Sequence, residues 1–127
     1  MREILFRGKS LDFCDWLCGY IRQYQNGKIT ICDFETKRLW FVDPSTVGQF
    51  TGLADKNGKK IFEGDIVKHY CEHNTDGIIS VGTVFWDEKH CMFLRTCTDG
   101  NETPQIWSSC EYEVIGNIHD NPELLEG

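Results

Sequence analysis

The sequence contains no long apolar run and no long helical pattern. None of its 127 residues lies in a stretch near the ~18 apolar residues that are needed to cross a bilayer, so we predict no membrane segment. No segment longer than about twelve residues repeats apolar side chains at the helical period of 3.6 residues. Helical bundles and helical membrane proteins are therefore excluded as fold classes.

Basic residues are scarce in the second half of the chain. Residues 61–127 contain three Lys and Arg against thirteen Asp and Glu, whereas residues 1–60 contain ten against seven. The net charge of -7 opposes non-specific binding to nucleic acid. The preferred interpretation of the uneven distribution is one domain with two differently solvated faces, and the alternatives are head-to-tail self-association or a local basic face.

The N-terminus lacks the apolar core of a signal peptide. Met1–Glu3 leads directly into a strand-like segment, so we expect a soluble protein of the cytoplasm. The seven cysteines are an odd number, which argues against a framework of disulfides. We expect reduced thiols, used mainly as small buried apolar side chains, at Cys14, Cys18, Cys32, Cys91 and Cys97.

Short β-prone segments alternate with turn residues at a spacing of about ten residues, as in barrels and sandwiches. The Asn26–Gly27 pair predicts a type I′ hairpin turn, in which both residues have positive φ. One helical turn is expected at Pro122–Leu125, with proline in its first position. The predicted strands are 3–7 at a sheet edge, 16–24, 28–33, 38–42, 47–51, 60–62, 66–70, 78–86, 91–94 and 111–118.

These elements predict a mostly β fold with two parts in one compact unit. Residues 1–45 are predicted to form an N-terminal subdomain of β-hairpins. Residues 46–127 are predicted to form a small SH3-like or partly open β-barrel.

The most regular segment of the chain is 47–67, VGQFTGLADKNGKKIFEGDIV. Its glycines Gly52, Gly58 and Gly64 are six residues apart and place a permissive backbone at three consecutive bends. Asp55 and Asp65 are expected to accept backbone N–H bonds within those turns. A phosphate cradle would need a glycine-rich loop that enters a helix, so this segment is interpreted as scaffold.

A metal site is an alternative in the second half. His69, Cys71 and His73 alternate along one strand, but structural zinc usually uses paired ligands two to four residues apart. His90 and Cys91 are adjacent in the sequence, so their side chains would point to opposite faces of a strand. We therefore predict no metal site, no cofactor and no catalytic residue, and a metal-dependent enzyme built around His69 and His73 remains the least favoured alternative.

Aromatic and basic residues are interleaved in the first half. If residues 16–24 form one strand, Trp16, Tyr20, Arg22 and Tyr24 share a face. Such a surface suits protein contacts, and with Lys28 and Lys37 it would also suit single-stranded nucleic acid. Core aromatic residues would give a similar pattern. The candidate interaction residues are Trp16, Tyr20, Arg22, Tyr24, Arg38 and Trp40.

Several segments closely resemble the YopX family of phage and prophage proteins. They are Arg2–Arg7, Thr46–Leu53, Asp55–Lys59, Ile61–Val67 and Glu113–Leu125. The resemblance extends from end to end and implies a small, mostly β protein from phage or prophage DNA with a barrel-like C-terminal portion and a tendency to self-associate. It supplies no catalytic residue.

Three hypotheses of function follow. The first is a non-enzymatic, oligomeric protein-interaction module of phage or prophage origin. The second is an accessory factor that binds nucleic acid through the basic and aromatic first half. The third is the metal-dependent enzyme.

Overall fold

The computed structural model describes residues 3–70, 79–89, 91–95 and 112–125. The fold is mostly β, as predicted, and its described strands pair antiparallel. The chain divides into two compact units, Met1–Gly52 and Leu53–Gly127, which are described separately. Among the described residues, no helix has the length and apolar character to cross a membrane.

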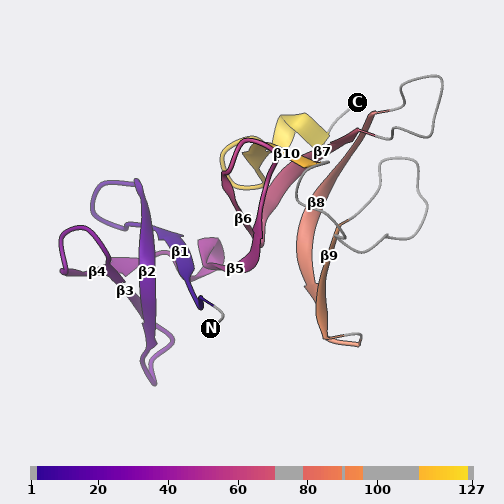
Figure 1. Cartoon of the computed structure of the whole chain (residues 1–127). Helices are drawn as coiled ribbons and strands as arrows, with labels where there is room; N and C mark the ends of the chain where they lie inside the picture. The colour runs from indigo at the N-terminus through magenta and orange to yellow at the C-terminus, as the bar shows by residue number, and fades with distance from the viewer. Residues whose placement is uncertain (1–2, 71–78, 90, 96–111, 126–127) are drawn as a thin grey trace. The chain divides into compact units, whose positions relative to one another are not determined.

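The first unit is built on one antiparallel sheet (Figure 1). Its strand order is β4-β3-β2-β1-β5. The predicted position of the first strand at a sheet edge is wrong, because Phe6 in β1 pairs with Gly19 on one side and Gln49 on the other. The elements are β1 (Phe6–Lys9), β2 (Trp16–Gln23), β3 (Ile29–Asp33), β4 (Leu39–Val42), the 3₁₀ turn η1 (Pro44–Thr46) and β5 (Gly48–Ala54).

The sheet of the first unit curls, so that β4 also bonds to the end of β1. Ser10 and Val42 form an isolated antiparallel bridge, and the Asp43 N–H donates to the Lys9 carbonyl at 2.8 Å. The buried side of the sheet packs Leu17, Ile29, Ile31 and Val42 together. A Cβ atom on Gly8 would lie 3.2 Å from both Ile31 and Val42, so glycine lets this core close tightly.

The hairpin between β2 and β3 differs in detail from its prediction. Gly27 alone adopts positive φ there, at 86°, so the predicted type I′ conformation at Asn26 is wrong. The Gly27 N–H donates to the Tyr24 carbonyl at 3.0 Å, and the Lys28 N–H donates to Asn26 Oδ1 at 3.0 Å. The longer loop between the strands needs only one left-handed residue.

The second unit contains a four-stranded sheet in the order β10-β7-β8-β9 (Figure 1). Its strands are β7 (Asp65–Tyr70), β8 (Ile79–Asp87), β9 (Met92–Arg95) and β10 (Tyr112–Asn117), and β6 (Lys60–Phe62) is the neighbour of β5. The core joins Ile61, Val67, Val84 and Tyr112. The predicted helical turn at Pro122–Leu125 is confirmed and is the 3₁₀ turn η3 (Pro122–Leu125).

The described strands of the second unit do not close into a barrel, so of the two predicted alternatives, SH3-like or partly open, the structure does not have the closed form. The outer edge of β10 is occupied by the turn between β5 and β6. The Lys56 N–H donates to the Tyr112 carbonyl at 2.9 Å, and the Val114 N–H donates to Asp55 Oδ2 at 3.0 Å. These backbone groups of β10 are therefore not available for a further strand.

Candidate functional site

One face of the first sheet combines aromatic and basic side chains, and we call it the outer face. Along β2, Leu17 and Gly19 are buried while Tyr20 and Arg22 are exposed, as alternation in a half-buried strand requires. Directly paired residues share a face, so the strand register extends this surface across four strands. The outer face consists of Arg7, Lys9, Trp16, Cys18, Tyr20, Arg22, Thr30, Cys32, Leu39 and Phe41.

Large apolar side chains of the outer face remain in solvent. Tyr20 is 61% exposed, Leu39 57% and Phe41 45%. Register pairing places Cys32 between Tyr20 and Leu39. Single exposed apolar residues are common, but several on one sheet face mark a contact surface.

Positively charged groups lie over the aromatic rings. The Arg7 guanidinium is 4.7 Å from the ring centre of Trp16, that of Arg22 is 5.2 Å from Tyr24, and Lys28 Nζ is 5.7 Å from Phe41. Each distance is within the range of cation–π attraction. The rings of Tyr24 and Phe41 are 6.1 Å apart and connect this arrangement along the face.

The structure brings together four of the six predicted interaction residues. Trp16, Tyr20 and Arg22 lie on the outer face, and Tyr24 joins them through its contacts with Arg22 and Phe41. Arg38 is exposed in the turn before β4, where its carbonyl accepts from the Asp33 N–H.

Trp40 lies on the opposite face of the sheet. It packs against the core of the first unit and meets the Phe13 ring edge-on at 5.1 Å. Sequence reasoning missed Phe41, although alternation along residues 38–42 would have placed Leu39 and Phe41 on one side and Trp40 on the other. It also missed Arg7 and Lys9, which alternate in β1.

An open groove of about 360 Å³ adjoins the outer face. Leu11, at one side, is 60% exposed, and Phe41 belongs to both the groove and the outer face. The volume lies in the range of known ligand and side-chain pockets. The lining residues are Leu11, Asp12, Asn26, Gly27, Lys28, Phe41, Val42 and Pro44.

The two buried carboxylates of the regular segment 47–67 stabilise turns. Asp55 is 6% exposed; its Oδ1 accepts from the N–H groups of Asn57 and Lys59, both at 2.9 Å, and its Oδ2 from Val114. Asp65 is 1% exposed, and its Oδ2 accepts from the Phe62 N–H at 2.8 Å. The prediction that both carboxylates accept backbone N–H bonds in these turns is confirmed.

The same contacts determine the pKa of the Asp55 carboxyl. Burial acts to raise the pKa of this carboxyl, but the N–H donors of Val114, Lys59 and Asn57, together with the Lys59 charge, outweigh burial and lower the pKa. Asp55 is therefore ionised in the folded state at neutral pH, with its oxygens engaged by backbone donors.

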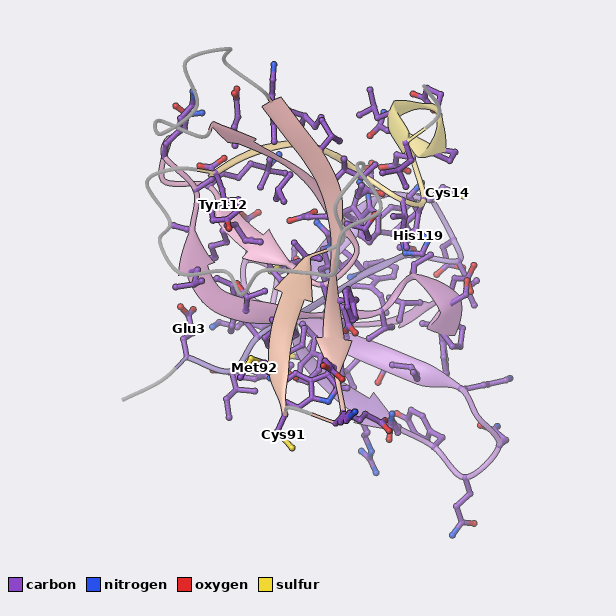
Figure 2. All side chains as sticks on the ribbon, turned by 90° about the vertical axis from the view of Figure 1, so that its right-hand side faces the viewer. Glu3, Cys14, Cys91, Met92, Tyr112 and His119 are labelled. Atoms are coloured by element: carbon purple, nitrogen blue, oxygen red, sulfur yellow. The ribbon has the colours of Figure 1, made fainter. Side chains whose placement is uncertain are left out.

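The described cysteines are not buried, so that prediction is wrong for four of them. Cys14 and Cys91 are exposed at turns, where their φ angles are 55° and 51°, and the Cys91 side chain extends outward beside β9 (Figure 2). Cys18 and Cys32 are half-buried because they lie on the outer face. Cys97 lies outside the described residues.

The predicted alternative of a metal site rests on side chains that lie outside the described residues, namely those of His69, Cys71, His73 and His90. Within the described part of the chain, no three His, Cys, Asp or Glu residues come close enough to hold a metal ion. The metal hypothesis stays a prediction.

Comparison with known proteins agrees with the fold. The crystal structure of protein EF1440 from Enterococcus faecalis is similar, with a TM-score of 0.57 and 24% sequence identity over 99% of this chain and 100% of that chain. At this identity the likeness concerns the fold alone. No curated protein matches the sequence. A family model described as YopX protein matches residues 12–126, and the chain therefore belongs to the YopX family.

Proposed function

We propose that this YopX-family chain is a non-enzymatic, oligomeric protein-interaction module of phage or prophage origin that acts in the bacterial cytoplasm. One observation carries the proposal: Tyr20, Leu39 and Phe41 are all exposed on the outer face. Exposed aromatic side chains on a rigid sheet are effective contact residues, because they bury a large area and lose little conformational freedom.

The buried carboxylates support a non-enzymatic role. A general acid or base has to reach a substrate, whereas Asp55 and Asp65 are almost fully buried and accept N–H bonds from their own backbone. Among the described residues, the acidic side chains with the strongest burial thus stabilise the fold.

The test compares Tyr20→Ser/Phe41→Ser with the unchanged chain. Light scattering measures the assembly mass, and pull-down from bacterial lysate measures captured protein. We expect the double variant to lose self-association or capture by about tenfold or more, since truncating central aromatic residues of an interface costs about 1–2 kcal/mol or more. Ile4→Ser is the matched control, because Ile4 is 56% exposed and precedes β1. A chain that is monomeric and captures nothing would contradict the proposal.

The cation–ring contacts favour a second candidate function, which is binding of single-stranded nucleic acid. Arg22 and Lys28 would neutralise phosphates while bases stack on Tyr20 and Phe41. Fluorescence anisotropy with a labelled oligothymidylate tests it. Binding should weaken steeply as salt rises and should fall in Arg22→Glu/Lys28→Glu. A flat titration at low salt would remove this candidate.

A further inference from the structure

The end of the second unit presents an acidic and apolar surface, which we call the C-terminal turn (residues 117–125). Ile118 is 37% exposed, Leu124 39% and Leu125 40%. Asp120 and Glu123 are exposed between these apolar residues. Two leucines that follow two carboxylates form a compact contact motif.

Hydrogen bonds hold this turn in one conformation. Asn117 Oδ1 accepts from the N–H groups of His119 and Asp120 at 3.0 and 2.9 Å, and the Asn121 N–H donates to the Asn117 carbonyl at 2.8 Å. The Ile118 N–H donates to the Gly64 carbonyl at 2.9 Å, which ties the turn to the start of β7. A segment fixed before it binds loses little further freedom on association.

The groove beside the outer face has the complementary character. Leu11 and Phe41 give it an exposed apolar surface, and Lys28 contributes a positive charge on the Phe41 side. Arg22 adds a second exposed cation through the same cluster of rings, because it lies over Tyr24, whose ring contacts Phe41. Asp12 lies on the Leu11 side, so an acidic occupant is steered toward Lys28 and away from Asp12.

We propose that the groove and the adjoining outer face bind the C-terminal turn of a second copy of this chain. Leu124 and Leu125 of that copy enter the groove between Leu11 and Phe41, while Asp120 and Glu123 face Arg22 and Lys28. Charge complementarity favours a second copy of this chain as the partner, since residues 61–127 have an excess of ten acidic groups and residues 1–60 have an excess of three basic ones.

The contact joins two different surfaces, so it is heterologous and builds a ring or an open chain of copies. This inference rests on the oligomeric state in the proposed function and names the surfaces that produce it.

A charge exchange tests the pairing. In Arg22→Glu/Lys28→Glu the first surface becomes acidic, and in Asp120→Lys/Glu123→Lys the second becomes basic. Each variant alone pairs like charges and is expected to elute with the mass of one chain. In an equimolar mixture, alternation of the two variants restores opposite charges at every contact, and the mixture is expected to assemble again. Lys37→Glu/Lys89→Glu reverses two exposed charges outside both surfaces and is expected to keep that mass.

The outcomes separate this inference from the proposed function. If the unchanged chain assembles but both charge variants retain its mass, the pairing of these surfaces is wrong and the oligomeric module stands. If each variant is monomeric and the mixture stays monomeric, the pairing is also wrong, because complementary charge does not rescue it. If the unchanged chain is monomeric at all concentrations, self-association fails altogether, and capture of another protein by the outer face then decides the proposed function. Far-ultraviolet circular dichroism confirms that each variant is folded.

Discussion

Replacing Asp55 by alanine should destabilise the second unit more than any other single carboxylate change among the described residues of the regular segment 47–67. The substitution removes the acceptor of three backbone N–H groups. The bond from Val114 is part-buried and joins residues 59 positions apart, so its loss costs about 1.5–3 kcal/mol, the usual value for a bond to a charged group. The two turn donors belong to exposed residues that water can reach, and each adds about 0.5–1.5 kcal/mol.

The expected total for Asp55→Ala is therefore about 2.5–6 kcal/mol of the free energy of unfolding. Asp55→Asn keeps one amide oxygen for the turn but turns its N–H₂ group toward the Val114 N–H, so it should lose about 1.5–3 kcal/mol. Urea unfolding followed by circular dichroism gives these values. Hydrogen exchange at the Val114 amide should accelerate in both variants, which locates the effect.

Asp43→Ala is the matched control. Asp43 also accepts within its own turn, from the Ser45 N–H at 3.0 Å and the Ser45 hydroxyl at 2.8 Å. Loss of such a local cap costs about 0.5–2 kcal/mol. The reasoning is refuted if Asp55→Ala costs no more than Asp43→Ala, because the distant bond to Val114 would then contribute nothing.

The remaining predictions concern acid, glycine and thiol chemistry. The pKa of Asp55 is lowered below its ordinary value of 3.8. The stability that the Asp55 carboxylate contributes is therefore present above about pH 4 and disappears as pH falls through the folded-state pKa. Acid should lower the urea midpoint of Asp55→Asn less than that of the unchanged protein. A Cβ on Gly58 would meet open space, but φ is 83° there, so Gly58→Ala should lower the free energy of unfolding by about 1–2 kcal/mol. A Cβ on Gly19 would lie 1.8 Å from a backbone oxygen, so Gly19→Ala should prevent folding of the first unit. Circular dichroism and thermal melts would measure both effects. Iodoacetamide should label Cys14 and Cys91 faster than Cys18 and Cys32 in the native protein, and equal rates by peptide mass mapping would contradict the exposures.

The sequence predicted those features whose cause is local. The six-residue spacing of glycines predicted a permissive backbone at three positions, and Gly52, Gly58 and Gly64 adopt φ angles of 91°, 83° and 91°, although Gly52 lies within β5. Only glycine reaches this region without a steric penalty, so the spacing alone carries the information. Most strands were also predicted within one or two residues, because alternation and turn residues act over short distances.

Features that depend on distant pairing were not predictable. The bond from Val114 to Asp55 spans 59 positions, and no pattern near either residue signals it. The choice between a closed and an open arrangement of the described strands has the same origin, since the turn that occupies the edge of β10 is remote in sequence. Trp40 was included among the interaction residues because it is aromatic, whereas the two-residue alternation of this strand puts Phe41, and not Trp40, on the outer face.

The regular segment 47–67 identifies the family but does not by itself determine what the chain binds. Gly64 donates its N–H to the Val84 carbonyl at 2.8 Å and accepts from Ile118 at 2.9 Å, so this one glycine joins β8 to the segment after β10. Asp55 joins a third element, β10, by the same means. Polar groups used in this way cannot bind a ligand without breaking the fold. By contrast, Tyr20 and Phe41 can change without disturbing a core hydrogen bond, and we therefore expect binding specificity to depend on the outer face.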